Sequence, residues 1–355
     1  MDESTSTAQP VRINSEPAQL QALQPLIEAV GELVGDVPAL LEIAKDIGRT
    51  APHPGEGSTG KLWEVLASVT AVDVAAGRVL EPHLDAVHIL AQAGQPEPEG
   101  AWGVFAAEGP GMRLEATRDQ SGNYVLNGAK PWCSLASQLD GAVITAHLPG
   151  GQGRAAFAVN LQQHGVTCET PEWTSRGLRE IPSGTVHFEQ IPATLLQGPG
   201  WYHERPGFAW GGIGVAACWL GGAVGLARDF AGALTDAADK GREPDQLALA
   251  HLGEIDRLIA SAAALLARTA ERIDANMTGA GPSAWSEAQR ARGTVAAAVE
   301  RIQALVSQNR GPGPLAFDEW YGKQMADLSL YVRQHHAMRD DAQLGSLALK
   351  GDRAW

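Results

Sequence analysis

Hydrophobic positions divide the chain into a helical first part, a middle part of short strands and a long helical last part. From residue 20 to residue 47, apolar residues recur at helical spacing, and Pro38 divides this pattern into two helices. A loop rich in Gly and Pro covers residues 49–60, and residues 62–94 then predict one or two further helices. Residues 1 to about 17 are polar, and we expect them to be frayed.

From Trp102 the pattern changes to short runs in which apolar and polar residues alternate. Turns at residues 121–123, 149–151 and 182–184 separate these runs. Several short strands at regular spacing predict a small antiparallel barrel or sandwich. In the run from Thr185 to Ile191, we expect Val186 and Phe188 to share one face.

From Gly207 the pattern is helical again, and a first long helix is followed by helices expected at 247–274, 285–308 and 318–343. Four long helices fit an antiparallel bundle. The run GGIGVAACWLGG follows no strand, so its glycines indicate close helix packing rather than a dinucleotide fingerprint. The predicted fold class is α+β, with an N-terminal helical domain (1–98), a middle β-domain (99–198) and a C-terminal four-helix bundle (199–355).

Composition narrows the classes of protein that fit. The 27 Lys and Arg against 41 Asp and Glu give a formal charge of −14, which argues against a protein that grips nucleic acid through its phosphates. Cys133, Cys168 and Cys218 form no CxxC pair, which indicates a reducing compartment. The N-terminus does not have the pattern of a signal peptide, and we expect no membrane span, so the predicted location is the cytoplasm.

The stretch NYVLNGAKPWCSLAS, residues 123–137, carries the clearest chemical pattern. It begins as a strand, and we expect the strand to break at Asn127-Gly128 and at Lys130-Pro131. A large flat aromatic, Trp132, then stands two residues before a small hydroxyl, Ser134. The indole suits one face of a planar heterocycle, and the hydroxyl suits its edge. Taken alone, the stretch also fits a core Trp after a turn.

This stretch resembles the β-domain segment of the acyl-CoA dehydrogenase family, in which a strand and a turn lead to Trp-x-Ser/Thr packed on FAD. Three other segments are similar to the family in the same order, and they read AWGVFAAEGPG, SRGLREIPSGTVHFEQIPA and GPGWYHERPGFAWGGIGVAACWLGGAVGLARDF. The resemblance runs from about Leu62 to Gly345 and identifies a divergent, shortened member. It implies the three-part fold and an FAD cofactor, with Trp132 on the ring and Ser134 near the reactive flavin nitrogen. It also implies a small-molecule acyl substrate, for example an acyl-CoA, and a homodimer or homotetramer.

Two further cofactor residues follow from the resemblance. Glu108 lies in the place of the family's Thr-Glu-Pro loop, where Gly-rich amides would cradle a pyrophosphate, although a plain β-turn fits equally well. Arg242 lies between the first two bundle helices, where a family Arg reaches FAD phosphates across a subunit interface. The Phe-Gly that usually follows this Arg is absent, so an exposed surface Arg is an equal alternative.

Oxidation of an acyl thioester between Cα and Cβ needs a base, and the usual Glu is not identifiable in this sequence. The family has it either at the start of the first bundle helix, which reads FAWGGI here, or near the last helix, where no matching motif occurs. Glu204 and Asp340 are the nearest candidate catalytic residues. We therefore predict that ordinary acyl-CoA dehydrogenation is weak or absent.

Two alternatives to dehydrogenation stay open. One is a flavin-dependent monooxygenase of the same fold, which needs no α-carbon base. The other is a non-catalytic partner subunit of an active homologue.

We expect no metal site: on a helix Glu81 and Asp85 share a face while His83 points away, and His83 is expected to pack against the β-domain or to line a cavity. The neighbouring His335 and His336 are expected to diverge on the last helix.

Overall fold

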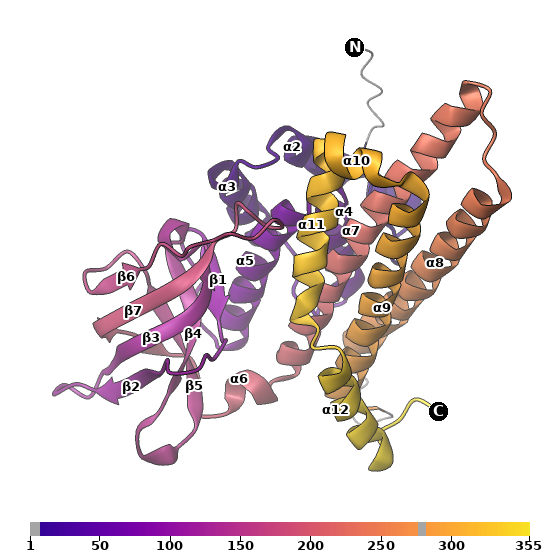
Figure 1. Ribbon diagram of the computed structural model, residues 1–355. Helices are drawn as coiled ribbons and strands as arrows, with labels where there is room; N and C mark the ends of the chain where they lie inside the picture. The colour runs from indigo at the N-terminus through magenta and orange to yellow at the C-terminus, as the bar shows by residue number, and fades with distance from the viewer. Residues whose placement is uncertain (1–7, 276–281) are drawn as a thin grey trace.

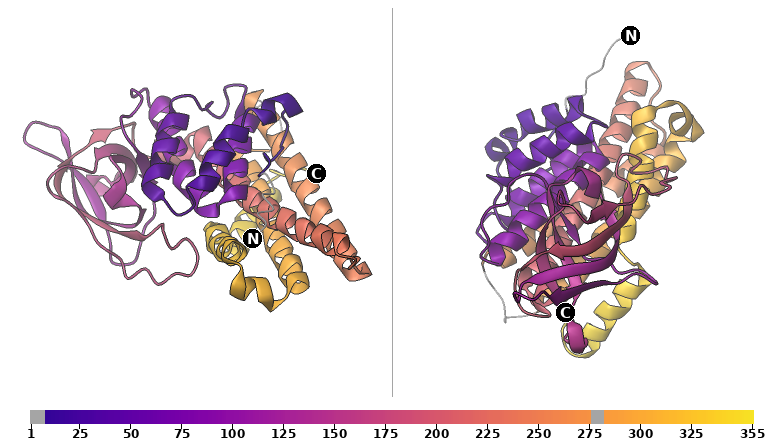
Figure 2. Two further views of the ribbon diagram at one scale, coloured as in Figure 1. Left: turned by 90° about the horizontal axis from the view of Figure 1, so that it is seen from above. Right: turned by 90° about the vertical axis from the view of Figure 1, so that its left-hand side faces the viewer.

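The computed structural model describes residues 8–275 and 282–355, and these form three groups of elements (Figure 1). The sheet lies on one side, the N-terminal helices lie next to it, and the long C-terminal helices lie on the far side (Figure 2). This order of helical part, β part and helical bundle confirms the predicted fold class. The domain boundaries stay a prediction.

The N-terminal part contains the helices expected from its apolar spacing, and they are α1 (Pro17–Gln21), α2 (Gln24–Glu32), α3 (Val37–Gly48), α4 (Thr59–Val72) and α5 (Val74–Gln92). Asp73 separates α4 from α5, and its carboxylate accepts a hydrogen bond from the amide of Ala76 at 3.1 Å. An Asp at the N-cap stabilises a helix in this way, so one residue both ends α4 and starts α5.

The expectation of a frayed N-terminus is wrong for residues 8–16, and residues 1–7 lie outside the described residues. Val11 and Ile13 are buried, and one oxygen of Glu64 accepts hydrogen bonds from three successive amides, those of Ile13, Asn14 and Ser15, each at 2.8 Å. The buried carboxylate of Glu64 on α4 thus fixes residues 13–15, in a segment that contains few apolar side chains.

The middle part is a single eight-stranded sheet. Its strands are β1 (Trp102–Phe105), β2 (Leu114–Arg118), β3 (Tyr124–Ser134), β4 (Gly141–His147), β5 (Arg154–Asn160), β6 (Val166–Cys168), β7 (Ser183–Pro192) and β8 (Thr194–Leu195). The order is β6-β7-β3-β2-β4-β5-β8, with β1 paired to β4. Val186 and Phe188 are buried on one face of β7, as expected. The sheet is mixed rather than purely antiparallel, because β1 runs parallel to β4 and β2 meets β4 in parallel at one pair of residues.

The predicted breaks in β3 are bulges within a continuous strand. Pairing with β7 shifts register between Leu126 and Gly128 and again between Lys130 and Cys133. Pro131 has no N–H to donate, so it is tolerated in a strand where the ladder is already interrupted. The strand therefore continues past Pro131 and ends at Ser134.

The C-terminal part contains α6 (Trp201–Glu204), α7 (Pro206–Asp239), α8 (Gln246–Asp274), α9 (Ala284–Arg310), α10 (Pro312–Phe317), α11 (Glu319–Tyr331) and α12 (Met338–Leu349). Short 3-10 turns cover Ala136–Gln138, Pro149–Gly151 and Val332–Gln334.

Helix α7 is the central helix of the molecule and packs on α4. A Cβ atom at Gly221 would come within 2.1 Å of the carbonyl oxygen of Ala67, so only glycine allows this approach. Contrary to the expectation from sequence, α7 is long and apolar enough to cross a membrane, but 83% of its most apolar window is buried inside the molecule. Its hydrophobicity is accounted for by its place in the core.

The predicted helix at 318–343 is wrong as one element, because the chain breaks between α11 and α12. Arg292 of α9 donates a hydrogen bond to the carbonyl of Gln334 at 2.8 Å, which satisfies an end carbonyl, and Ala337 has a φ of 50°. The break also changes the predicted divergence of the histidines. Both rings approach Asp340, His335 Nε2 at 3.7 Å and His336 Nδ1 at 3.4 Å.

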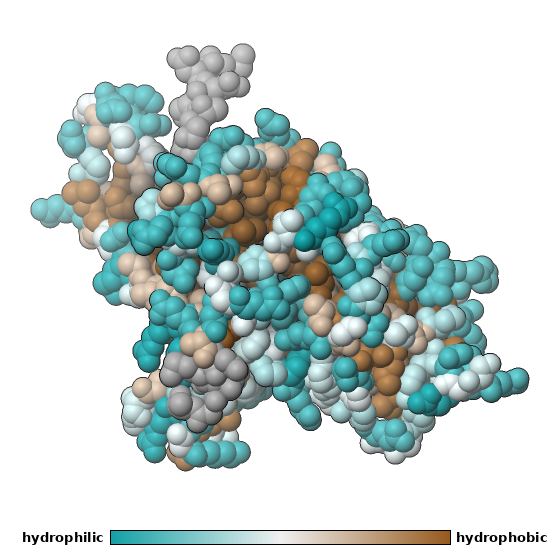
Figure 3. Space-filling view, turned by 180° about the vertical axis from the view of Figure 1, so that it is seen from behind, coloured by the Kyte–Doolittle hydropathy of each residue, from teal (hydrophilic) through white to brown (hydrophobic). Residues whose placement is uncertain are grey.

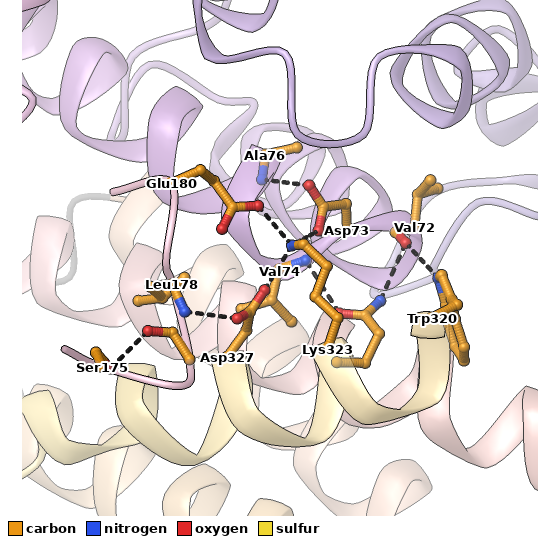
Figure 4. A network of polar contacts seen from close by, with 12 residues as sticks. Val72, Asp73, Val74, Ala76, Ser175, Leu178, Glu180, Trp320, Lys323 and Asp327 are labelled. Carbon is orange, nitrogen blue, oxygen red and sulfur yellow. Dashed lines mark hydrogen bonds and ion pairs between the residues drawn. The ribbon is translucent and has the colours of Figure 1, made fainter. Parts of the chain in front are cut away.

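The three parts meet at Lys323 of α11 (Figure 4). Its ammonium lies 2.5 Å from Asp73, 2.8 Å from Glu180 of the loop before β7, and 2.6 Å from Asp327 of α11. We call these four residues the junction cluster. Within residues 8–275 and 282–355, its three carboxylates are the one group whose spacing would suit a metal ion, and Lys323 supplies the positive charge among them.

Candidate functional site

Trp132 and Ser134 stand where β3 ends. Trp132 is 63% exposed, and its φ of 60° lies in the left-handed region at the second bulge of β3. A bulky residue in this conformation is uncommon, and such residues cluster at ligand sites. The core-Trp alternative is therefore excluded: the bulge presents the indole to solvent.

Ser134 begins a polar chain that leads from the sheet into the helices. Its hydroxyl lies 2.7 Å from that of Ser183 and accepts a hydrogen bond from Nη2 of Arg78 on α5 at 3.1 Å. Nη1 of Arg78 lies 3.7 Å from a carboxylate oxygen of Glu81, which is too long for a hydrogen bond. The same oxygen accepts a hydrogen bond from the hydroxyl of Tyr331 on α11 at 3.3 Å. The chain Ser134–Arg78–Glu81–Tyr331 thus joins the sheet to both helical parts.

Glu81 and Asp85, one turn apart on α5, line a cavity between α5 and α7, which we call the α5–α7 cavity. Its volume is about 30 Å³, room for about two water molecules. Burial raises the pKa of Glu81 to about 7, with the charge of Arg78 opposing the shift and that of Asp85 adding to it. Burial also raises the pKa of Asp85, against the charge of Arg205.

The α7 wall of this cavity includes Trp210, Gly211 and Gly214, and Gly211 is close to Asp85. A Cβ atom on Gly211 would be 2.8 Å from a carboxylate oxygen of Asp85. Residue 211 belongs to the FAWGGI segment, one of the two places where the resemblance led us to look for a base. The carboxylates at this place therefore come from α5, across the cavity.

Other polar groups on the cavity wall find no hydrogen-bond partner within the described part of the protein. They are the indole nitrogen of Trp63 and both ring nitrogens of His88. Burial lowers the pKa of His88 to about 3, with the charge of Arg205 adding to the shift, so its ring is neutral at pH 7. Unpaired buried polar groups are costly, and they are frequent where a protein binds a ligand or carries out chemistry.

Glu108 lies in the loop between β1 and β2, where its carboxylate meets basic side chains of β3, β4 and β5. Its carboxylate accepts a hydrogen bond from Lys130 at 2.8 Å and lies 2.9 Å from His147 and 3.2 Å from Arg154. Burial raises the pKa of Glu108, but the hydrogen bonds of Lys130 and His147 and the nearby charges outweigh it and lower the pKa to about 2. The carboxylate is thus ionised and engaged with basic side chains. Cofactor binding by Glu108 stays a prediction.

The remaining predicted residues lie apart from the cavity lining. Arg242 is exposed in the loop after α7, at the opposite end of that helix from the cavity (Figure 1). Glu204 is exposed on α6. Asp340 is buried in the first turn of α12, where it accepts a hydrogen bond from the amide of His336 at 3.0 Å. None of these three side chains lines the α5–α7 cavity.

His83 has both of the expected structural roles. Its Nδ1 accepts a hydrogen bond from the amide of Trp102 on β1 at 3.1 Å, and its ring lines a second cavity of about 360 Å³ beside α3. Burial lowers the pKa of His83 to about 4, and the charges of Lys45 and Arg49 add to the shift. A neutral His83 therefore connects α5 to the sheet.

This architecture, with a mixed sheet between N-terminal helices and a C-terminal bundle, defines the class of acyl-CoA dehydrogenase-fold proteins. Residues 105–191 match the family described as "Acyl-CoA dehydrogenase, middle domain". Residues 105–191 thus match this family's middle domain, and the predicted resemblance to the acyl-CoA dehydrogenase family is confirmed. Dibenzothiophene monooxygenase from Rhodococcus erythropolis is 26% identical over 169 residues, which is 40% of this chain and 40% of that protein. The chain thus spans less than half the length of this curated relative.

Solved structures of the same fold cover nearly the whole chain. KijD3 in complex with FMN and a dTDP-amino sugar has a TM-score of 0.77 at 16% identity, covering 98% of this chain and 97% of KijD3. TdsC from Paenibacillus sp. A11-2, in complex with FMN and indole, has a TM-score of 0.77 at 18% identity, covering 95% and 98%. Glutaryl-CoA dehydrogenase from Mycobacterium smegmatis has a TM-score of 0.77 at 15% identity, covering 96% of each chain. At these identities the likeness shows the fold.

Sequence reasoning missed Arg78 altogether and considered Glu81 and Asp85 only as metal ligands. The i, i+4 spacing of the two acids was visible, and it placed them on one face of a helix. What the sequence did not show was that this face is buried against glycines of α7, more than 120 residues away.

Proposed function

We propose that the protein is a flavin-dependent oxidoreductase whose flavin ring packs against Trp132. The observation that carries this proposal is the exposed indole of Trp132, which the bulge presents to solvent two residues before Ser134. Stacking a flat ring on such a side chain contributes roughly 1–3 kcal/mol, by analogy with nucleobase stacking. The family of the middle domain supports the same cofactor class.

The residues around Trp132 fit a flavin. Ser134 offers a hydroxyl for the ring edge, and Nη1 of Arg78 is buried without a hydrogen-bond acceptor in the described part of the protein. A bound flavin supplies the exchange of electrons or of a hydride. The part of this chain is to hold the ring, to exclude water from one face and to place a guanidinium near its edge, which favours the more negative reduced form.

FAD is the cofactor we propose to test first, with FMN alongside it. The resemblance implies FAD, while KijD3 and TdsC carry FMN and a glutaryl-CoA dehydrogenase structure carries FADH2. Arg242 lies too far along α7 to join Trp132 in one chain, so any contact with FAD phosphates would come from a second copy. FMN carries only one of the two phosphates of FAD, so the preference between the two cofactors also tests the role of Arg242.

A small-molecule substrate is proposed to bind in the α5–α7 cavity. Apolar side chains such as Leu62 and Leu66 form part of its wall, and Glu81 connects it through Arg78 to Ser134. Because the cavity holds only about two water molecules, a substrate larger than a few atoms requires wall side chains to move.

Two reactions fit this site. Oxidation of an acyl thioester is the reaction that the family resemblance implies. Monooxygenation is the second candidate, favoured by the match to dibenzothiophene monooxygenase and independent of an α-carbon base. The prediction that ordinary acyl-CoA dehydrogenation is weak applies to the first reaction, and a cytoplasmic location stays a prediction for both.

The proposal is tested on the purified full chain by absorption spectroscopy during titration with FAD and with FMN. The loaded protein is then reduced anaerobically with short, medium and long acyl-CoAs. In a separate arm, chemically reduced protein is exposed to air with indole or dibenzothiophene. Bleaching by an acyl-CoA supports dehydrogenation, and hydroxylated or sulfoxidised product supports monooxygenation. A colourless protein that binds neither flavin contradicts the proposal and favours the non-catalytic partner subunit.

We also propose that the protein forms a homodimer or a dimer of dimers. Leu247 and Leu249 at the start of α8 are 69% and 54% exposed, and apolar side chains reach the surface in several patches (Figure 3). Light scattering is expected to give a mass of two or four chains. A stable monomer at micromolar concentration with flavin bound contradicts this.

A further inference from the structure

We propose that Glu81 is the acid–base residue of this site, exchanging a proton with the substrate group that faces it across the α5–α7 cavity. This inference rests on the proposed function and names a residue for it. It replaces the search for a base at Glu204 and Asp340 with a carboxylate from the N-terminal helices.

The first argument is position. Glu81 lines the cavity, and the guanidinium of Arg78 lies between its carboxylate and the hydroxyl of Ser134. A group bound in the cavity would therefore contact Glu81 while the flavin edge would contact Ser134. A general acid or base must lie within hydrogen-bond distance of the reacting group and must also be in the correct protonation state. Its position is the first of these two requirements.

The second argument is incomplete pairing. The side chain of Glu81 is only 12% exposed, yet among the described residues its nearest cation is 3.7 Å away and its one hydrogen bond, from Tyr331, measures 3.3 Å. A carboxylate retained for stability is expected to have closer partners, because a buried charge costs several kcal/mol unless it is paired well. The weak pairing leaves Glu81 able to take up and release a proton near neutral pH.

The charged and titratable groups around Glu81 come from five helices, and they are Arg78 and Asp85 on α5, Tyr202 on α6, Cys218 on α7, Arg292 on α9 and Tyr331 on α11. Arg78 and Arg292 favour the ionised form, and Asp85 favours the protonated form. Burial raises the pKa values of Tyr202, Cys218 and Tyr331 far above neutral pH, so all three stay protonated there. Burial also raises the pKa of Asp85, and Glu81 is the carboxylate of the two that contacts Arg78 and Tyr331.

The proton step balances without a further reactant. In the direction of a base, the bond from hydrogen to carbon, nitrogen or oxygen of the substrate breaks, and an O–H bond forms on Glu81. The electron pair of that bond stays on the substrate, where it forms the new double bond, and a bound flavin would accept the hydride that leaves the adjacent atom. Glu81 then releases the proton to solvent.

Infrared difference spectroscopy of the full chain from pH 5 to pH 9 tests the proposal, with and without FMN or FAD. The wild type is expected to show a protonated-carboxyl band that disappears with a midpoint near pH 7. The band is expected to be absent in Glu81→Gln and to shift its midpoint when flavin binds near Arg78. Asp85→Asn is expected to lower the midpoint, because it removes a neighbouring negative charge. No carboxyl titrating between pH 6 and pH 8 overturns the proposal.

The rate is measured with whichever compound the wild type converts, an acyl-CoA, indole or dibenzothiophene. If the wild type converts none of them, the infrared titration alone decides the proposal. Glu81→Gln is expected to lose about 10²–10⁴-fold in rate together with the pH dependence near 7, while Glu81→Asp restores part of both. Glu115→Gln, which changes an exposed carboxylate on β2, is the matched control. Wild-type rate and pH profile in Glu81→Gln overturn the proposal. Titration of Glu81→Gln with flavin tests the proposed function separately, because the affinity of this variant for flavin is expected to equal that of the wild type.

Discussion

Two groups of acids meet helix α5, one at its start and one two turns later, and they differ in how closely their carboxylates are paired. At the start of α5, Asp73 belongs to the junction cluster, where Lys323 lies within 2.8 Å of three carboxylates. Two turns later, Glu81 and Asp85 line a cavity, and the closest cation to Glu81 is 3.7 Å away. The first group is closely paired and the second is not.

The difference separates a structural cluster from a functional one. Burial lowers the pKa of Lys323, but Asp73 and Asp327 outweigh it and hold the pKa above its usual range, so the ammonium stays charged. At Glu81 burial outweighs Arg78 and raises the pKa to about 7. A protein gains no stability from a carboxylate held in this state, and perturbed groups of this kind are concentrated at functional sites.

The largest expected effect breaks the junction cluster. Lys323→Met leaves three buried carboxylates without their cation, and breaking a buried pair in this way costs ~3–5 kcal/mol. Chemical denaturation at pH 7 measures the loss, and Lys350→Met, at an exposed position, is the control. A change below 1 kcal/mol would mean that the junction cluster does not hold the three parts together.

Glu81→Gln is expected to act in the opposite direction and to stabilise the protein at high pH. The pKa of Glu81 rises from 4.5 to about 7 on folding, and a difference of about 2.5 units corresponds to about 3 kcal/mol as an upper value. Because the folded pKa is raised, the cost of ionising Glu81 is fully present above pH 7 and disappears as the pH falls to 4.5. The variant should therefore exceed the wild type in stability at pH 8 and match it near pH 4.5. Lower stability of the variant at pH 8 would place Glu81 with the structural cluster.

Trp132→Ala tests the exposed side of the proposed flavin site. Loss of stacking is expected to weaken flavin affinity by about 5- to 150-fold, corresponding to roughly 1–3 kcal/mol. Trp355→Ala removes another exposed indole, at the C-terminus, and should leave the affinity unchanged. Equal affinities in the two variants would remove Trp132 from the site.

The smallest expected effect is that of Ser134→Ala. Losing the hydroxyl removes the bonds to Arg78 and Ser183, at a cost of about 0.5–1.5 kcal/mol in stability. It should also lower the reduction potential of the bound flavin, because a donor at the ring edge favours the reduced form. Spectroelectrochemistry measures this potential, and an unchanged potential with reduced stability would assign Ser134 a structural role alone.

The elements of this fold were largely predictable from apolar spacing and turn residues, because each strand or helix has a local pattern. The errors arose where a distant group decides the local structure. Arg292 and Asp340 stabilise the break at His335–Ala337 without any Gly or Pro there. Likewise Glu64 binds the amides of residues 13–15, which look like a frayed terminus in sequence.

The candidate site was predictable only on the sheet side. Trp132 and Ser134 lie close together in sequence and carry a local motif, so the pair could be found before the structure was known. Arg78 and Glu81 lie on α5 and Tyr331 lies on α11, and only the packing of α5 on the sheet and on α11 joins these residues to Ser134. Arg242 lies outside the site of one chain, and a contact with the cofactor across an interface stays a prediction.

The most direct test of the account is a flavin titration of the purified full chain and of Trp132→Ala, followed by absorption and by quenching of tryptophan fluorescence. The account predicts one flavin bound per wild-type chain, with affinity reduced about 5- to 150-fold in the variant, corresponding to roughly 1–3 kcal/mol. Failure of the wild type to bind either FAD or FMN, or binding that Trp132→Ala leaves unchanged, would contradict it.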